Sequence, residues 1–366
     1  MNLVISAGDP SGDIRAGELF RKLSALVPVE ASGLGGSNLS DAGVDVLFNL
    51  EDYSVMGFAE VISSLNRFRN LRNEMKSLII SENPDAVLLV DYPGFNIPLA
   101  QWAKKKGFKV IYYISPQLWA WGKGRVKKIR NSVDLMITLF EFEVEFYNQH
   151  GVRAVCAGHP LVDAIPEPSN SKPEGDLALL PGSREQEVAG LLDPMLDAYS
   201  ILRSRGIVRK ASVAMTESVP SRLYDRAFNT EGVTPVNSIR ASLQNASAAV
   251  VCSGTATLET ALWGIPFIIT YRTSRLTYLL AKVLVRGVDR IGMANIVSGK
   301  DVAPELIQNN VTAFNIAERI IPLLSETGTR KKSLSDIKYV RKALGDNGAA
   351  ERAARLLYNE IKHENP

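Results

Sequence analysis

The chain has few residues of the kinds that build disulfide frameworks or zinc centres. Its 366 residues include two cysteines and three histidines. Cys156 and Cys252 each lie in an apolar, strand-like run, so we expect buried thiols in a reducing compartment. The histidines, His150, His159 and His363, are too scattered to form a zinc site with them. His159 follows a predicted strand, and both a ligand contact and a structural role stay open for it.

Long apolar runs and a strong charge of one sign are also missing. No run approaches the roughly 18 apolar residues that span a bilayer. Residues 1–6 enter a strand directly, so we expect no signal peptide and a cytoplasmic protein. The 42 basic and 39 acidic residues give a net charge of +3, too small to indicate nucleic-acid binding. The length of 366 residues favours two domains over one core.

The sequence does contain a stretch suited to an anion, residues 253–259, SGTATLE. An apolar run before it predicts a buried strand, and the apolar spacing after it predicts a helix. Unpaired N–H groups and the dipole at a helix start favour negative charge. We predict that Ser253 or Thr255 caps this helix, that Ser253, Gly254 and Thr255 hold a diphosphate, and that Glu259 holds a ribose. An ordinary capped helix is the alternative.

Predicted strands alternate with helices in two halves of the chain. The strands cover residues 3–7, 29–34, 86–90, 110–114, 135–139 and 153–157, then 177–180, 211–215, 233–236, 248–252 and 267–271. Residues 165–175 have the composition of a linker. This alternation predicts an α/β fold with two Rossmann-like domains, 1–164 and 175–344, facing a cleft as in nucleotide-sugar transferases. The fold by itself does not settle the chemistry.

Polar residues follow several predicted strands, where open α/β sheets place their chemistry. The candidates are Gly8, Asp9, Ser11, Gly12, Asp91 and Gln117 from the first half, and Gly182, Ser183, Arg184, Ser253, Gly254, Thr255, Glu259 and Asn295 from the second. A carboxylate such as Asp91 or Asp9 can act as a general base, and the Arg184 guanidinium can neutralise a leaving diphosphate. Asn295 is suited to orient a sugar or a diphosphate.

Two segments of the first half combine apolar or aromatic residues with cations. Their candidate membrane contacts are Met56, Phe58, Arg67, Phe68, Arg69 and Arg72 in one segment, and Trp119 and Trp121 in the other. Such mixtures suit an anionic membrane surface, and we predict reversible association through residues 55–76 and 118–130. A core helix with a solvated basic face, and buried tryptophans, are the alternatives.

A series of motifs resembles the lipid-A-disaccharide synthase family over nearly the whole chain. They are residues 6–13 (SAGDPSGD), 55–61 (VMGFAEV), 90–96 (VDYPGFN), 114–121 (ISPQLWAW), 157–161 (AGHPL), 179–184 (LLPGSR), 253–259 (SGTATLE) and Asn295. The chain departs from the family pattern at Asp9, usually Glu, and at Glu141 and Ala294, usually Pro. The carboxylate at Asp9 is one methylene shorter but keeps its charge.

The resemblance implies an inverting glycosyltransferase of the GT-B architecture. It would transfer 2,3-diacylglucosamine from UDP-2,3-diacylglucosamine to 2,3-diacylglucosamine 1-phosphate, forming the β-1,6-linked disaccharide 1-phosphate and UDP. Catalytic roles would fall to Asp91, Asp9, Arg184 and Asn295. The resemblance also implies UDP binding by the second domain, no obligatory metal or other cofactor, and a peripheral location on the cytoplasmic face of the inner membrane. Residues 345–366 would pack back onto the first domain.

Two other classes of protein stay open. A UDP-sugar 2-epimerase would share the architecture but would leave the cationic aromatic segments unexplained. A non-catalytic nucleotide-sugar or lipid-binding relative is favoured only by the change at Asp9. The sequence is also compatible with a homodimer.

Overall fold

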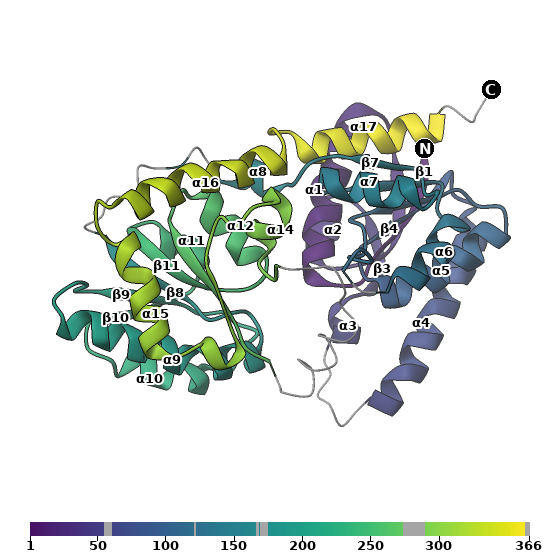
Figure 1. Cartoon of the computed structure of the whole chain (residues 1–366). Helices are drawn as coiled ribbons and strands as arrows, with labels where there is room; N and C mark the ends of the chain where they lie inside the picture. The colour runs from purple at the N-terminus through teal and green to yellow at the C-terminus, as the bar shows by residue number, and fades with distance from the viewer. Residues whose placement is uncertain (55–60, 121, 166–167, 169–174, 274–289, 363–366) are drawn as a thin grey trace. The chain divides into compact units, whose positions relative to one another are not determined.

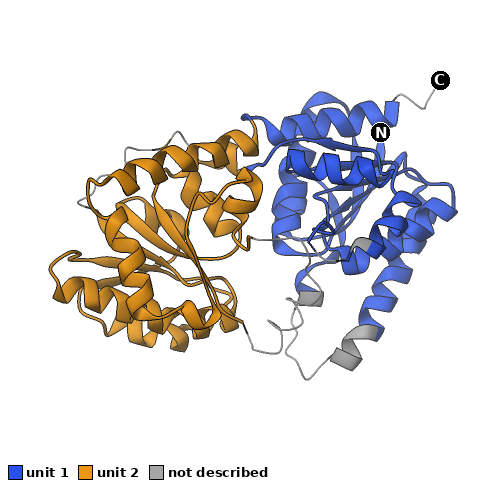
Figure 2. Ribbon diagram, in the orientation of Figure 1, with its two compact units in different colours: residues 1–160, 346–366 blue, residues 161–345 orange. Residues whose placement is uncertain are grey.

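The computed structural model describes residues 1–54, 61–120, 122–165, 168, 175–273 and 290–362 (Figure 1). The chain forms two compact units, unit 1 with Met1–Pro160 and Asp346–Pro366, and unit 2 with Leu161–Gly345 (Figure 2). The C-terminal helix α17 (Ala349–Lys362) belongs to unit 1 and packs against α1 (Pro10–Leu26). Residues 274–289 lie outside the described residues, as do the candidate membrane contacts Met56, Phe58 and Trp121.

Unit 1 is built on a parallel sheet of seven strands in the order β3-β2-β1-β4-β5-β6-β7. The strands are β1 (Asn2–Ala7), β2 (Glu30–Gly35), β3 (Asp45–Asn49), β4 (Ala86–Val90), β5 (Val110–Tyr113), β6 (Leu135–Thr138) and β7 (Ala154–Cys156). Besides α1 and α17, the helices include α2 (Ser37–Ser40), α3 (Glu51–Ser54), α4 (Val61–Glu82), α5 (Pro93–Lys105), α6 (Val126–Arg130) and α7 (Glu141–Gln149), with a 3-10 turn η2 (Lys123–Arg125). The central strand β4 is buried along its whole length, as expected for a parallel strand covered on both faces.

Unit 2 is built on a parallel sheet of six strands in the order β10-β9-β8-β11-β12-β13. The strands are β8 (Asp176–Leu180), β9 (Ala211–Ala214), β10 (Val233–Val236), β11 (Ala246–Cys252), β12 (Phe267–Tyr271) and β13 (Glu305–Ile307). The described helices are α8 (Leu161–Ala164), α9 (Glu185–Ser204), α10 (Asp225–Phe228), α11 (Ile239–Leu243), α12 (Thr255–Leu262), α14 (Met293–Ser298), α15 (Ala313–Ile320) and α16 (Gly328–Leu344), with 3-10 turns η3 (Ser221–Tyr224), η4 (Gln308–Asn310) and η5 (Ile321–Leu323).

The strand order reverses once in each sheet, and these reversals position the candidate residues. In unit 1 the order runs outward in both directions from β1 and β4, and in unit 2 from β8 and β11. Ligands of open α/β sheets bind beyond the carboxyl ends of the strands at such points. The turns after these four strands contain Asp9, Asp91, residues 182–184 and residues 253–255.

The structure corrects the predicted elements mainly at the sheet edges. The strands β3 and β13 were missed, because edge strands are short and carry charged or half-exposed residues. Residues 221–228 form a 3-10 turn followed by one α-helical turn. Cys156, predicted to be buried, is half-buried. No helix in the described ranges is long and apolar enough to cross a membrane.

Candidate functional site

Unit 2 contains a cavity of about 570 Å³ at the carboxyl ends of β8 and β11. All the second-half substrate-binding candidates line it, namely Gly182, Ser183, Arg184, Ser253, Gly254, Thr255 and Glu259. Thr216, Asn237 and Ser238 also line it and were missed, although they follow the strands β9 and β10 and obey the same strand-end rule. The structure therefore gathers residues from four strand ends around one space.

The helix α12 begins at this cavity without a side-chain cap. Its N-cap is Gly254, with φ 152° and ψ −162°, a conformation open essentially to glycine alone. The prediction that Ser253 or Thr255 caps the helix is wrong. The Ser253 hydroxyl instead donates to the Ile291 carbonyl at 2.9 Å, and no side chain in the described residues caps α12. The positive end of this helix is thus available to a ligand anion.

The helix α9 begins at the same cavity but already has an acceptor. The Glu187 carboxylate accepts from the backbone N–H of Ser183 at 2.9 Å and from that of Arg184 at 3.3 Å. It also pairs with the Arg184 guanidinium, at 2.9 Å. The Arg184 side chain is 81% exposed and that of Glu187 is 13% exposed. Sequence reasoning missed Glu187, although a Glu at the third position of a helix is a known capping signal.

The charges that line the cavity are mostly negative. They comprise the carboxylates of Glu187, Glu217 and Glu259 and the guanidinium of Arg184. Carboxylates at the wall suit sugar hydroxyls, whereas an anion must rely on Arg184 and on the backbone N–H groups of α12. No group of three or more metal-ligating His, Cys, Asp or Glu side chains occurs in the described part of the chain.

Asn295 does not reach the cavity. It is 1% exposed, and its amide donates to the Ala303 carbonyl and to the Glu305 carboxylate, both at 2.8 Å. Glu305 in turn accepts from the backbone N–H groups of Ile291 and Gly292, next to the hydroxyl of Ser253. Direct contact between Asn295 and a ligand, which the sequence predicted, does not fit this environment. Asn295 braces the loop that holds Ser253.

In unit 1, Asp91 follows β4 in a strained turn. Asp91 has φ 44° and Tyr92 has φ 48°, both in the left-handed region that non-glycine residues avoid. The Asp91 carbonyl accepts from the Asn96 amide at 2.9 Å and from the Tyr112 hydroxyl. Burial, and then the charge of Asp9, raise the pKa of Asp91 to about 6. Strain and a raised pKa in one carboxylate are typical of a functional group.

The turn after β1 brings Asp9 close to this carboxylate. Asp9 accepts from the Ser11 hydroxyl, and its Oδ1 atom is buried without a hydrogen-bond partner in the described residues. A Cβ on Gly12 would lie 2.6 Å from that Oδ1, and a Cβ on Gly8 would lie 2.2 Å from the Tyr92 ring. The two glycines predicted to bind substrate are therefore required for packing around Asp9 and Tyr92. Gln117, after β5, is exposed.

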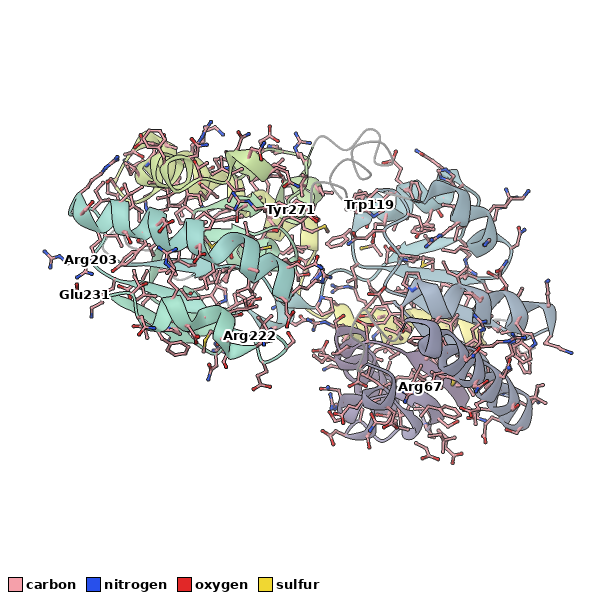
Figure 3. All side chains as sticks on the ribbon, turned by 90° about the horizontal axis from the view of Figure 1, so that it is seen from below. Arg67, Trp119, Arg203, Arg222, Glu231 and Tyr271 are labelled. Carbon is pink, nitrogen blue, oxygen red and sulfur yellow. The ribbon has the colours of Figure 1, made fainter. Side chains whose placement is uncertain are left out.

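The described membrane candidates have partners inside unit 1. Phe68 lies 6.4 Å from the Tyr92 ring, and Arg67 donates to the Asp52 carbonyl. Trp119 donates to the Glu143 carboxyl at 3.2 Å, and burial raises the pKa of that carboxyl to about 7. Arg67 and Trp119 lie apart on unit 1 (Figure 3). Arg69 is exposed and Arg72 is partly exposed, so α4 has a basic face in contact with solvent.

The family model and the related sequences indicate the same family. A family model described as lipid-A-disaccharide synthetase matches residues 3–357. A lipid-A-disaccharide synthase from Syntrophus aciditrophicus is 40% identical, with 98% of each chain covered. Enzymes of the same name from Geobacter metallireducens (97% of this chain and 96% of that one) and Coxiella burnetii (98% of each) are 38% and 36% identical.

Comparisons of the structure show the GT-B architecture. MurG from Acinetobacter baumannii has a TM-score of 0.62 at 13% identity, covering 98% of this chain and 99% of that one. The calicheamicin glycosyltransferase CalG4 has 0.62 at 12%, covering 100% and 99%. A UDP-GlcNAc 2-epimerase from Neisseria meningitidis has 0.58 at 10%, covering 99% of each. Transferases and an epimerase share this fold, so the fold leaves both activities open and only the sequence family separates them.

Proposed function

The chain belongs to the lipid-A-disaccharide synthase family of glycosyltransferases, and we propose that it joins two acylated glucosamine units with release of UDP. The donor would be UDP-2,3-diacylglucosamine and the acceptor 2,3-diacylglucosamine 1-phosphate. The observation that supports this proposal is that each unit contains a group suited to one half of the reaction. Unit 2 has an uncapped helix start in a cavity, and unit 1 has a half-buried carboxylate on a strained turn.

In this proposal unit 2 binds the leaving group, UDP. A diphosphate at the start of α12 would accept hydrogen bonds from backbone N–H groups and face the positive end of the helix. The Arg184 guanidinium, at the same cavity, would neutralise charge as UDP departs. Glu259 lines the cavity one turn into α12 and is suited to a ribose diol. This supply of positive charge supports a reaction without an obligatory metal.

In this proposal unit 1 activates the attacking group, the acceptor's primary hydroxyl. An α-linked donor and a β-linked product require one inversion, in which the acceptor's primary hydroxyl attacks the anomeric carbon. Asp91 would take the proton of that hydroxyl, a contribution of about 10²–10⁴-fold. With a pKa of about 6 it is mostly ionised at pH 7 and is still basic enough to accept a proton. Burial raises that pKa most and the charge of Asp9 adds to it. Asp9 is the second candidate for the base.

The protein would work as a peripheral protein on the cytoplasmic face of the inner membrane, because both sugar substrates carry acyl chains. The exposed basic face of α4 is the described surface that supports this. Flotation with anionic vesicles tests it. Charge reversal at Arg69 and Arg72 should reduce the bound fraction, and unchanged binding would remove α4 from the proposal.

One assay tests the reaction. The purified chain is incubated in detergent with donor and acceptor, with and without EDTA, and disaccharide 1-phosphate and UDP are measured. Formation of both products, unaffected by EDTA, is expected. Interconversion of UDP-sugars without acceptor would indicate an epimerase. Binding of UDP-sugar with no product would indicate a non-catalytic relative.

A further inference from the structure

Two helices begin at the cavity of unit 2, and they differ in what occupies their first N–H groups. The helix α12 begins at Gly254 with no side-chain cap. The helix α9 has Arg184 as its N-cap, and the backbone N–H groups of Arg184 and of Ser183 before it donate to the carboxylate of Glu187 in the same helix. Both helix starts line the cavity, and before α9 the N–H groups of Ser183 and Arg184 already have an acceptor.

The turn before α9 is shaped around the Glu187 carboxylate. Gly182 has φ 119°, and a Cβ there would lie 2.5 Å from Oε2 of Glu187. The Cys252 thiol borders the same place, since that Cβ would also lie 3.2 Å from its sulfur. Burial, and then the charge of Glu187, raise the pKa of Cys252 to about 12. The carboxylate therefore occupies a fitted position between β8 and β11 rather than a solvated one.

The pair with Arg184 has little value for stability. The Arg184 side chain is mostly exposed, and solvent screens exposed ion pairs. The pair does restrict a long, flexible side chain at the cavity wall. Holding a guanidinium in place before a ligand arrives reduces the entropy lost when the side chain is ordered on binding.

We propose that Glu187 is a positioning residue of the donor site, an inference that rests on the proposed function. It accepts from the N–H groups of Ser183 and Arg184, and it holds the Arg184 guanidinium toward a diphosphate bound at α12. A carboxylate in an anion site would otherwise repel the ligand. Glu187 avoids this conflict because Arg184 and two N–H groups already compensate its charge.

A double-mutant cycle tests the coupling between Glu187 and Arg184. UDP affinity is measured by calorimetry for the full chain and for Glu187→Gln, Arg184→Ala and the double variant. Glu187→Gln should weaken UDP binding about fivefold when Arg184 is present and less than twofold when it is absent. An equal loss in both backgrounds would indicate a packing role, and no loss in either would also overturn the proposal.

The matched control is Glu185→Gln, which removes the same charge from the same helix turn. Glu185 is exposed and does not line the cavity, so UDP affinity should stay within twofold. A fivefold loss there would show that the helix-end charge alone is responsible. If Glu187→Gln does not fold, Glu187→Asp replaces it, because the shorter side chain also withdraws the carboxylate from Arg184.

The transfer assay separates this inference from the proposed function. If the wild-type chain binds UDP but forms no disaccharide, the proposed function fails and the cycle still decides the role of Glu187. If it forms disaccharide and the cycle shows no coupling, only the role of Glu187 fails. If it binds no UDP, both fail.

Discussion

The turn after β4 in unit 1 and the turn after β11 in unit 2 occupy equivalent places, but they are built from opposite kinds of residue. Each follows a fully buried strand where the strand order of its sheet reverses. The first places two bulky residues, Asp91 and Tyr92, in the left-handed region. The second places Gly254 at φ 152° and surrounds it with small residues.

The difference separates two kinds of chemistry. The strained turn costs about 1–3 kcal/mol per residue. It is held by Asn96 and Tyr112, which donate to the backbone carbonyl of Asp91 and so fix the position of its half-buried carboxylate. The glycine turn presents backbone donors and no charge of its own. One turn is suited to accept a proton and the other to bind an anion. A transfer that deprotonates a hydroxyl and releases a diphosphate needs both.

The largest effect is expected from Asp91→Asn. The amide keeps the shape of the carboxylate but cannot accept the proton, so the turnover number should fall about a thousandfold. UDP affinity should stay within twofold, because UDP is assigned to unit 2. Measurement of kcat and of UDP binding checks both.

Asp45→Asn is the control for Asp91→Asn, since Asp45 is an exposed carboxylate on the edge strand β3. It should leave turnover unchanged. Near-normal turnover of the Asp91 variant would remove Asp91 as the base and direct attention to Asp9.

Asp91→Asn should also stabilise the fold at neutral pH. The folded-state pKa of Asp91, about 6, lies above the ordinary value of 3.8, so the wild-type chain loses stability as pH rises from about 4 to 6. The Asn variant has no such loss, and above pH 6 its free energy of unfolding should be higher by about 1–3 kcal/mol. Thermal melts at pH 4 and pH 8 compare the two chains. An equal difference at both pH values would contradict the raised pKa.

The pH dependence of turnover follows from the same group. A base must be ionised, so kcat/KM should fall about tenfold per pH unit below pH 6 and level off above it. Removing the charge of Asp9 with Asp9→Asn should move this midpoint to lower pH. A midpoint that does not move would show that the charge of Asp9 has no effect on the base.

In unit 2, Gly254→Ala should weaken UDP binding about tenfold. No atom lies within 4 Å of the added Cβ, so the loss comes from the backbone conformation and not from a clash. Gly94→Ala is the control, because Gly94, the second residue of α5, also has open space around an added Cβ but no positive φ. If both variants weaken UDP binding equally, the backbone conformation of Gly254 is not what matters for the anion.

The sequence predicted this contrast only in part. Continuous apolar runs such as residues 86–90 and 248–252 predict buried parallel strands, and the strand-end rule then finds Asp91 and Gly254. Side-chain direction does not follow from either signal. Asn295 turns into the core and Trp119 turns toward Glu143, because contacts distant in sequence decide both orientations. Glu187 was missed because its role depends on its contacts with Ser183 and Arg184 in the folded chain.

The smallest effect is expected from Ser253→Ala, and it separates backbone from hydroxyl in the glycine turn. The Ser253 hydroxyl donates to the Ile291 carbonyl and does not cap α12. Its removal costs a neutral hydrogen bond, about 1 kcal/mol of folding free energy, while the N–H groups of α12 stay in place. UDP affinity should therefore change less than twofold. A loss as large as that of Gly254→Ala would mean that the hydroxyl, and not the backbone, binds the diphosphate.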